Sequence, residues 1–293
     1  MQLSLLVNAF GATDNAGVRM PKSESSEFVA SLERGLRVLQ SFSREHSQMT
    51  LSEVAAVTKL SAATARRSLH TLESLGYVGR SGRRFLLRPK VLGLSAGYLS
   101  AINAQVVLQP FVQEVVNEVG GSSSVTVLDD VDIVYLAHAS QNRAIRLTAG
   151  AGARYPAYAT AMGRVLLAFS PEPLVDTYLS RAKLRKLTEH TETNPATLRS
   201  ILKQVRAKGY AVIQDELDYG LVSVALPIFG PSGDIVAAAN CSDVTNNFDK
   251  DAMVEKRLPT LRRAVRRIES MLAQFPELAD SVAPDRTRPG VQT

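Results

Sequence analysis

The sequence predicts an α+β protein of two domains, a small basic helical domain followed by a larger domain with an antiparallel sheet flanked by helices. Its 293 residues are enough for two domains of ordinary size. Apolar residues recur at helical spacing through residues 31–75, whereas after residue 120 short β-rich runs alternate with helical ones. Residues 27–90 carry eleven basic and five acidic residues, so this segment holds a charge of +6, equal to the net charge of the whole chain.

Composition narrows the class of protein. With 45% hydrophobic and 21% charged residues, the chain reads as a soluble globular protein. A single cysteine, Cys241, rules out an intramolecular disulfide and a cysteine-rich metal site, and the four histidines show no metal-ligand spacing. No apolar run approaches the roughly 20 residues that span a bilayer. We therefore expect a cytoplasmic protein with no metal, no cofactor and no membrane association.

The two ends of the chain are expected to be disordered, over residues 1–26 and 276–293. Residues 11–26 are small and polar, and the apolar start MQLSLLVNAF has no basic segment before it, which argues against a signal peptide. Met20 precedes a stretch that reads like a natural beginning. We therefore expect the first nineteen residues to be dispensable.

Residues 27–90 begin with three predicted helices. SLERGLRVLQSF, from Ser31, spaces its apolar residues as a helix does. Thr50 is followed three residues later by Glu53, a capping box that starts a second short helix. Lys59 and Leu60 form a tight connection, and Ser61 is placed to cap the third helix.

The third helix, over residues 62–75, has two unlike faces. Ala65, Leu69 and Leu72 fall on one side, whereas Arg66 and Arg67 fall broadly opposite. Two helices joined by a short turn, the second with slim residues and two guanidiniums exposed, favour a helix-turn-helix that enters the major groove of DNA. Two exposed arginines alone can be merely solvated. The whole set of features favours DNA binding.

A basic hairpin follows the third helix. Gly76 ends the helix, and Ser81-Gly82 is a turn between two strand-like runs. Such a hairpin is the wing of a winged helix-turn-helix, placed to contact phosphate or the minor groove. The predicted DNA-binding residues of residues 27–90 are Thr50, Ser61, Ala62, Ala63, Thr64, Arg66, Arg67, His70, Arg80, Arg83 and Arg84.

The rest of the chain predicts a linker helix over residues 91–104 and a second domain over residues 105–275. β-rich runs SSSVTVLDD, DIVYLAHAS and AIRLTAG come first, and helices are expected over 161–168, 172–179 and 195–208. Strands at 222–229 and 235–241 follow, joined by the turn GPSG, and an amphipathic helix over 251–272 closes the domain.

These motifs resemble the IclR family of bacterial transcriptional regulators. The resemblance runs from about Phe28 to about Leu272 and includes LSEVAAVTKLSAATARRSLHTLESLGYV, YPAYATAMGRVLLA and VRAKGYAVIQDELDYGLVSVALPIF. It implies a GAF-like effector-binding domain after the linker, a double-stranded DNA operator of roughly palindromic form, and a homodimer or homotetramer. The family usually has Arg or another polar residue after the capping serine; Ala62 departs from this, which shifts base readout to Thr64, Arg66 and Arg67.

PAYATAMGRVLLA and the length of the second domain most resemble the branch that regulates aromatic acid catabolism, the protocatechuate and 4-hydroxybenzoate regulators. The resemblance implies a small organic acid, with the segment 159–163 at a helix start lining its pocket, because a helix amino end suits a carboxylate. Arginines would supply a cation for the acid, and tyrosines would stack on its ring. Each arginine can equally be a surface residue or part of a structural ion pair. Arg164 can bridge to Asp215 or Glu216. The expected effector-binding residues are Arg143, Arg146, Tyr155, Tyr158, Thr160, Ala161, Met162, Asp215, Glu216, Ser223, Asn240 and Ser242.

The sequence argues against an enzyme. GAGARY begins like a dinucleotide-binding loop but lacks the third glycine and runs into Pro156, and the sequence has no nucleophile elbow, P-loop or zinc-protease motif. Adjacent Asp215 and Glu216 could be acid and base, but neighbouring carboxylates on a strand or loop point in different directions. We expect a ligand-responsive transcriptional regulator. The alternative is an architectural DNA-binding protein whose second domain only oligomerises.

Overall fold

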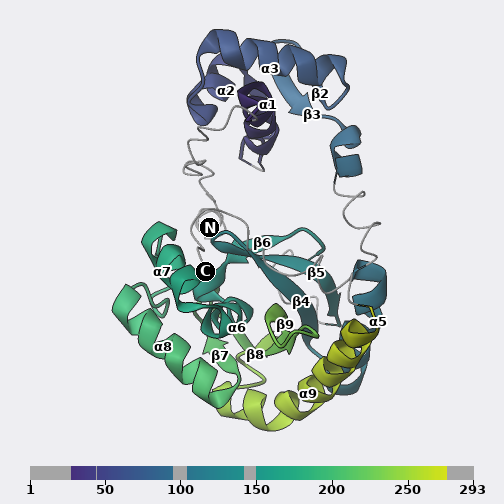
Figure 1. The fold of residues 1–293 in the computed structure, drawn as a ribbon, viewed down its shortest axis with the longest axis vertical. Coiled ribbons are helices and arrows are strands. Elements are labelled where there is room, and N and C mark those ends of the chain that lie inside the picture. The colour runs from purple at the N-terminus through teal and green to yellow at the C-terminus, as the bar shows by residue number, and fades with distance from the viewer. Residues whose placement is uncertain (1–27, 44, 95–103, 142–149, 276–293) are drawn as a thin grey trace, which may run out of the picture. The chain divides into compact units, whose positions relative to one another are not determined.

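The computed structural model describes residues 28–43, 45–94, 104–141 and 150–275 (Figure 1). The chain divides into two compact units, Met1–Tyr98 and Leu99–Thr293. Several sequence predictions lie outside the described residues: the two terminal segments, most of the linker helix and most of the strand expected in AIRLTAG. Within the described part, no helix is long and apolar enough to cross a membrane.

The first unit is a three-helix domain with a small antiparallel sheet of order β1-β3-β2 (Figure 1). Its core is apolar and contains Val38, Val54, Leu69 and Phe85, one from each of four elements. The elements are α1 (Ala30–Gln40), β1 (Met49–Thr50), α2 (Leu51–Thr58), α3 (Ala62–Ser74), β2 (Val78–Ser81), β3 (Arg84–Leu87) and a 3₁₀ turn at Pro89–Val91.

Local signals fix the helix-turn-helix. The Thr50 side chain accepts the N–H of Glu53, and the Glu53 carboxylate accepts the N–H of Thr50, so the predicted capping box is present. Lys59 then takes a left-handed conformation, with φ of 55°, which turns the chain sharply after α2. The Ser61 hydroxyl accepts the Thr64 N–H and starts α3, as predicted.

The second unit is a six-stranded antiparallel sheet of order β6-β5-β4-β9-β8-β7 with helices on both faces. Together with the first unit, it confirms the predicted α+β class. Its elements are α5 (Ala104–Val119), β4 (Ser122–Asp129), β5 (Asp132–Ser140), β6 (Arg154–Pro156), a 3₁₀ turn at Ala157–Ala159, α6 (Ala161–Phe169), α7 (Glu172–Arg181), α8 (Pro195–Lys208), β7 (Ala211–Gln214), β8 (Leu221–Phe229), β9 (Ile235–Val244) and α9 (Lys250–Gln274).

Two separate apolar cores hold the helices on this sheet. One face of the sheet packs against α5 and α9, and the other packs against α6, α7 and α8 (Figure 1). The strands alternate between the two cores, since Val125 and Val127 of β4 face α5 and α9 while Leu128 faces the other side. The sheet is therefore the middle layer of three.

Candidate functional site

Helix α3 has one buried and one exposed face. Ala65, Leu69 and Leu72 are buried in the core of the first unit. Ala62 and Ala63 are exposed at the amino end, followed by the exposed Arg66 and Arg67. The predicted division of the helix into a packing face and an outward face is confirmed. The outward face is slim enough at its start to approach DNA closely.

The predicted DNA-binding side chains divide into those that form hydrogen bonds or ion pairs within the protein and those that form none. Among the residues that the structure describes, the side chains of Arg66, Arg67, His70 and Arg83 have no hydrogen bond or ion pair. Because an arginine carries five donors and these have no partner in the described structure, the three arginines are available to a phosphate or a guanine edge. Arg66 and Arg67 stand on α3, and Arg83 stands on the hairpin turn between β2 and β3.

Other predicted DNA-binding residues also hold the domain together. Thr50 and Ser61 cap helices, and the Thr64 hydroxyl accepts a 2.9 Å hydrogen bond from Ser61. In the wing, Arg80 donates to Glu73 at 3.0 Å and lies over the Phe85 ring. Arg84 donates to the Gln48 carbonyl at 3.1 Å. These side chains position the exposed face, and their predicted contacts with DNA remain predictions.

In the second unit, polar side chains gather on the face of the sheet that also carries α6. Residues paired across antiparallel strands share a face. Ser124 of β4 pairs with His138 on one side and with Asn240 on the other, and in the next row Ser122 pairs with Ser242, which pairs with Ser223. We call this set the polar sheet face, defined by Ser122, Ser124, His138, Ser223, Asn240 and Ser242.

Asn240 lies at the centre of the polar sheet face with one atom unsatisfied. Its Nδ2 donates to Ser223 Oγ at 3.0 Å and to Ser242 Oγ at 2.7 Å, so both amide hydrogens are used. The Oδ1 atom is the only buried side-chain nitrogen or oxygen among the described residues with no hydrogen-bond partner. Leaving a buried acceptor unpaired costs about 1–3 kcal/mol, so such an atom points to a missing donor.

His138 and Ser124 extend the predicted site. Ser124 Oγ and His138 Nδ1 are 2.9 Å apart, and burial lowers the pKa of His138. The Tyr135 ring stands edge-on to the rings of His138 and of Tyr155, with ring centroids 6.2 and 5.8 Å away. Tyr155 is one of the predicted effector-binding residues. The sequence signal was the run SSSVTV, whose alternate residues had to share one face, but the partner strands could not be read from it.

The start of α6 borders this face. Thr160 caps the helix by accepting the Gly163 N–H at 3.0 Å, and Thr126 of β4 donates to the Met162 sulfur at 3.3 Å. Ala161 and Met162 are buried. A side chain at Gly163 would meet the Ala157 carbonyl oxygen at 2.2 Å, so only glycine permits this close approach. The helix start expected to line a pocket therefore lies against the strand that carries Ser124.

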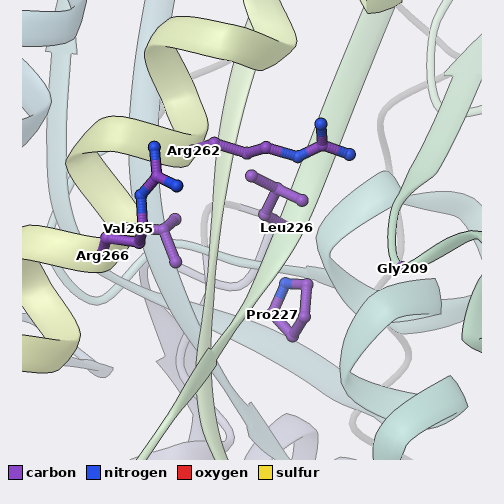
Figure 2. Close-up of a pocket in the computed structure, with 6 residues that line it drawn as sticks. All are labelled: Gly209, Leu226, Pro227, Arg262, Val265 and Arg266. Atoms are coloured by element: carbon purple, nitrogen blue, oxygen red, sulfur yellow. The ribbon is translucent and has the colours of Figure 1, made fainter.

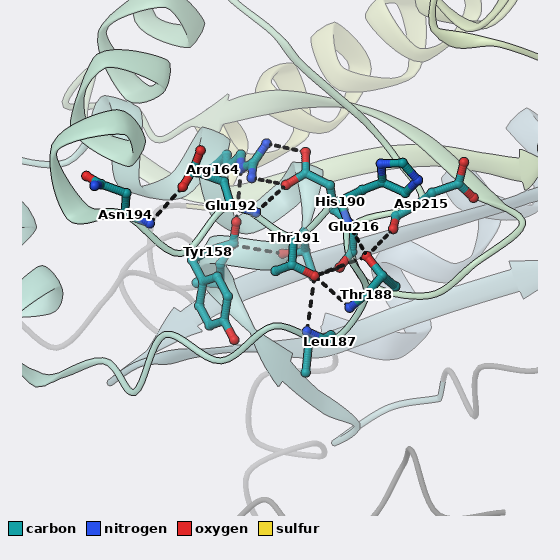
Figure 3. A network of polar contacts seen from close by, with 12 residues as sticks. Tyr158, Arg164, Leu187, Thr188, His190, Thr191, Glu192, Asn194, Asp215 and Glu216 are labelled. Atoms are coloured by element: carbon teal, nitrogen blue, oxygen red, sulfur yellow. Dashed lines mark hydrogen bonds and ion pairs between the residues drawn. The ribbon is translucent and has the colours of Figure 1, made fainter. Parts of the chain in front are cut away.

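Glu216 is engaged in a buried ion pair rather than standing open. Arg164 of α6 holds both Glu216 carboxylate oxygens with its fork, and its Nε donates to the Tyr158 carbonyl at 2.9 Å (Figure 3). The expectation that Arg164 bridges to Asp215 or Glu216 is confirmed for Glu216. Thr191 donates to the Glu216 carbonyl at 2.6 Å and closes the network around this loop.

Asp215 and Tyr158 also make internal contacts. Asp215 Oδ1 accepts the Gly220 N–H at 2.6 Å, and the Asp215 backbone is left-handed with φ of 58°. The Tyr158 hydroxyl donates to the Arg185 carbonyl at 2.7 Å and accepts the Arg185 N–H at 3.0 Å. Asp215 and Glu216 therefore bond in different directions, as expected of neighbouring carboxylates. Their predicted effector contacts remain predictions, and Arg143 and Arg146 lie outside the described residues.

Groups that would suit metal or thiol chemistry are not assembled in the described residues. No cluster of three or more His, Cys, Asp or Glu side chains that could hold a metal ion occurs among them. Cys241 points into the core on the α5 and α9 side, and burial raises the pKa of its thiol to about 12. A thiol held protonated in an apolar core is a packing group.

A winged helix-turn-helix with unengaged arginines, followed by a sheet domain with a buried polar face, defines a DNA-binding transcriptional regulator with a separate second domain. Residues 31–82 match the family described as the IclR helix-turn-helix domain, and residues 96–270 match the family described as bacterial transcriptional regulator IclR C-terminal. The chain belongs to the IclR family of bacterial transcriptional regulators. It is therefore a regulator and not an enzyme.

Named relatives agree with this assignment. The Pca regulon regulatory protein of Pseudomonas putida is 36% identical over 241 residues, which cover 82% of this chain and 83% of that protein. A crystal structure from Rhodococcus sp. RHA1 is 42% identical, covers 84% of this chain and 99% of its own, and superposes with a TM-score of 0.70. The inducer-binding domain of Acinetobacter PobR, a double mutant in complex with 3-hydroxybenzoic acid, is 27% identical, with a TM-score of 0.53, and covers 56% of this chain and 97% of its own.

Proposed function

We propose that this protein changes its affinity for an operator when a small hydroxylated aromatic acid binds at the polar sheet face of the second unit. The observation that carries the proposal is the buried, unpartnered Oδ1 of Asn240. Related proteins support the ligand class, since one is a Pca regulon regulator and another is a PobR domain in complex with 3-hydroxybenzoic acid.

The chemistry of Asn240 favours a hydroxyl on the ligand. Both amide hydrogens are already donated to serine oxygens, so the open atom is an acceptor that needs a donor. A phenolic hydroxyl supplies one, whereas a carboxylate does not. The aromatic ring of Tyr135, which contacts the rings of both His138 and Tyr155, provides a wall for the ligand's ring. The amino end of α6, beside Thr126, suits the carboxylate end.

The DNA end of the mechanism rests on α3 and the wing. Arg66 and Arg67 contact a base edge or a phosphate, and Arg83 contacts phosphate from the hairpin turn. The basic residues of the first unit give most of the affinity, which therefore falls as salt rises. Effector coupling of about 1–3 kcal/mol changes operator affinity about 5- to 150-fold, enough to switch occupancy.

We further propose that the protein acts as a homo-oligomer that presents paired recognition helices. Phe28, Val29, Leu32 and Leu36 leave an apolar stripe on and just before α1, with Leu32 62% exposed and Val29 58% exposed. Such spacing is typical of a helix that packs on another helix. A second copy covering this stripe would place two α3 helices on the half-sites of one operator.

The experiment is fluorescence anisotropy of the full-length protein on labelled DNA from upstream of its own and neighbouring genes, with excess nonspecific competitor. 4-Hydroxybenzoate, protocatechuate, benzoate and short keto acids are then added. We expect specific binding that shifts with a hydroxylated acid and shifts much less with benzoate. An architectural protein would bind DNA but ignore every acid, and that result would overturn the proposed effector response.

Variants of α3 separate base readout from phosphate contact. Arg66→Ala and Arg67→Ala should each weaken operator binding by about 1–3 kcal/mol. A loss confined to the operator means a base contact, and an equal loss on all sequences means a phosphate contact. Arg181→Ala, an exposed residue of the second unit, is the control with the same change of charge. Operator binding that is unchanged in both α3 variants would contradict the assignment of α3 to the DNA.

A further inference from the structure

Helix α9 carries two pairs of consecutive arginines, Arg262-Arg263 and Arg266-Arg267, and only the second arginine of each pair forms an ion pair. Arg263 forms an ion pair with Glu118, and Arg267 forms one with Glu114, both acids lying on α5. The first residue of each pair, Arg262 or Arg266, is exposed, and its side chain makes no hydrogen bond or ion pair with the residues that the structure describes. Because residues four apart on a helix are neighbours, these two unengaged guanidiniums stand on the same side of α9.

The two arginines border a depression in the surface of the second unit. Figure 2 shows Arg262 extending over Leu226 and Arg266 beside Val265. The depression has a volume of about 150 Å³, and we call it the α9 site. Its lining consists of six residues, Gly209, Leu226, Pro227, Arg262, Val265 and Arg266.

Sheet topology explains why the depression exists. β7 begins at Ala211, which pairs with Ala225, so the next β8 residues, Leu226 and Pro227, lie beyond the end of β7. Proline suits this position because it has no N–H for a further strand to accept. α8 ends at Lys208 with Gly209 as its C-cap, and Gly209 is one of the residues that line the depression.

The lining combines positive charge with an apolar floor. Leu226, Pro227 and Val265 are apolar, and no acidic side chain is among the six residues. The acid closest along α9, Glu269, accepts the Phe229 N–H at 2.9 Å, and burial raises its pKa. Its carboxylate is therefore bonded to β8, and it forms no ion pair with Arg262 or Arg266.

We propose that the α9 site binds a small monocarboxylate with an apolar body, such as a single-ring acid. Two guanidinium forks suit the two oxygens of a carboxylate, and the apolar floor suits the ring. The volume is below the roughly 300 Å³ at which pockets for drug-sized ligands begin, so the ligand must be small. Leu226 and Val265 belong to the core on the α5 and α9 side, so this site is separate from the polar sheet face.

The experiment follows the methyl signals of Leu226 and Val265 by NMR in the full-length protein while benzoate is added. Benzamide, which has the same ring but no charge, is the control ligand. Arg262→Gln/Arg266→Gln removes the two guanidiniums. Arg263→Gln/Arg267→Gln is the matched control, because it makes the same changes one residue along, where the arginines face α5.

We expect saturable shifts with benzoate in the wild type and in Arg263→Gln/Arg267→Gln. Binding should be at least about tenfold weaker in Arg262→Gln/Arg266→Gln, since hydrogen bonds to charged groups are lost. If that variant fails to fold, Arg262→Lys/Arg266→Lys keeps the charge without the forks and should still weaken binding. The shifts should persist in Asn240→Ala, which makes failure here distinguishable from failure of the proposed effector site.

Three results would overturn the proposal. The first is the absence of saturable shifts, which would mean that the arginines only offset the carbonyl dipoles at the end of α8. The second is an equal response to benzamide, which would assign the effect to the apolar floor alone. The third is a smaller sedimenting species for Arg262→Gln/Arg266→Gln without any benzoate response, which would assign the site to contact between copies of the chain.

Discussion

The two faces of the six-stranded sheet are formed by the same strands but differ in the polarity of their buried side chains. On the α5 and α9 side, β4, β8 and β9 present residues such as Val125, Val224 and Cys241, all within an apolar core. On the other side, the neighbouring residues Ser124, Ser223 and Asn240 are polar and equally buried. Since burying polar groups is costly unless they are bonded, the apolar face serves stability, whereas part of the other face is the site at which we propose that the effector binds.

The largest loss of stability should come from breaking the buried ion pair on the α6 side. Arg164→Met leaves the Glu216 carboxylate buried without its partner, so we expect a loss of about 3–5 kcal/mol in the free energy of unfolding. Urea unfolding followed by circular dichroism measures it. The half-buried Arg199, which pairs with the exposed Glu172 and Asp176, is the control, and Arg199→Met should cost less than about 1 kcal/mol. Equal losses would show that burial does not decide the cost.

On the apolar face, which packs against α5 and α9, shortening a buried side chain should lower the free energy of unfolding. Leu136 is about 1% exposed and packs in the core against α5 and α9. Leu136→Ala should lower the free energy of unfolding by about 2–5 kcal/mol, because the cavity is only partly filled by its neighbours. The operator response to acids, measured in the same protein where it remains folded, should be unchanged. A lost response with intact folding would mean that the two faces are not separate in function.

On the polar sheet face, we expect a substitution to change the response to acids and to leave the stability nearly unchanged. Asn240→Ala removes the unpaired acceptor, and Ser223 and Ser242 can still bond each other at 3.2 Å. We expect stability within about 1 kcal/mol of the wild type, together with loss of the response to hydroxylated acids in the anisotropy assay.

The neighbouring residue on the same strand provides the control for Asn240. Cys241 faces the apolar core, so Cys241→Ala should lower stability by about 1 kcal/mol and keep the response. A large loss of stability in Asn240→Ala, with the response retained, would show that Asn240 is a packing residue.

The smallest effect should be a pH dependence of the free energy of unfolding, caused by His138 at the edge of the polar sheet face. Burial lowers the pKa of His138 in the folded state, so the unfolded chain binds the proton more readily. The free energy of unfolding should therefore fall as pH drops below the ordinary histidine pKa of about 6.5. His138→Gln should lose less stability than the wild type over about pH 7.5 to 5. Parallel pH profiles for the two proteins would contradict this assignment.

Much of the first unit was predictable because its signals are local. The Thr50 capping box, the Ser61 cap and the two faces of α3 each depend on residues within one or two turns, and all three are confirmed. The helix over residues 195–208 with its Asn194 cap is confirmed for the same reason. In the second unit, the β-rich runs indicated the strands. The family resemblance implied Ser223, Asn240 and Ser242 as effector-binding positions.

Long-range contacts were not predictable in the same way. His138 joins Tyr135 on one face only because β5 has a bulge opposite Val125 and Thr126, so residues three apart point the same way. Arg164 and Glu216 are 52 residues apart, and the sequence left Asp215 as an equal partner. The α9 site depends on where β7 stops along β8, which no single segment records.

By itself, the sequence determined the fold class, the winged helix-turn-helix and the exposed arginines of α3, because helix periodicity, caps and turns are set by neighbours in the chain. Only the tertiary structure decided that Glu216 is held by Arg164, that Asn240 keeps an open acceptor beside Ser124, and that Arg262 and Arg266 border a depression. The physical reason is strand register. It pairs strands that are distant in the sequence, and a shift of one residue would turn Ser124 or Asn240 to the other face of the sheet.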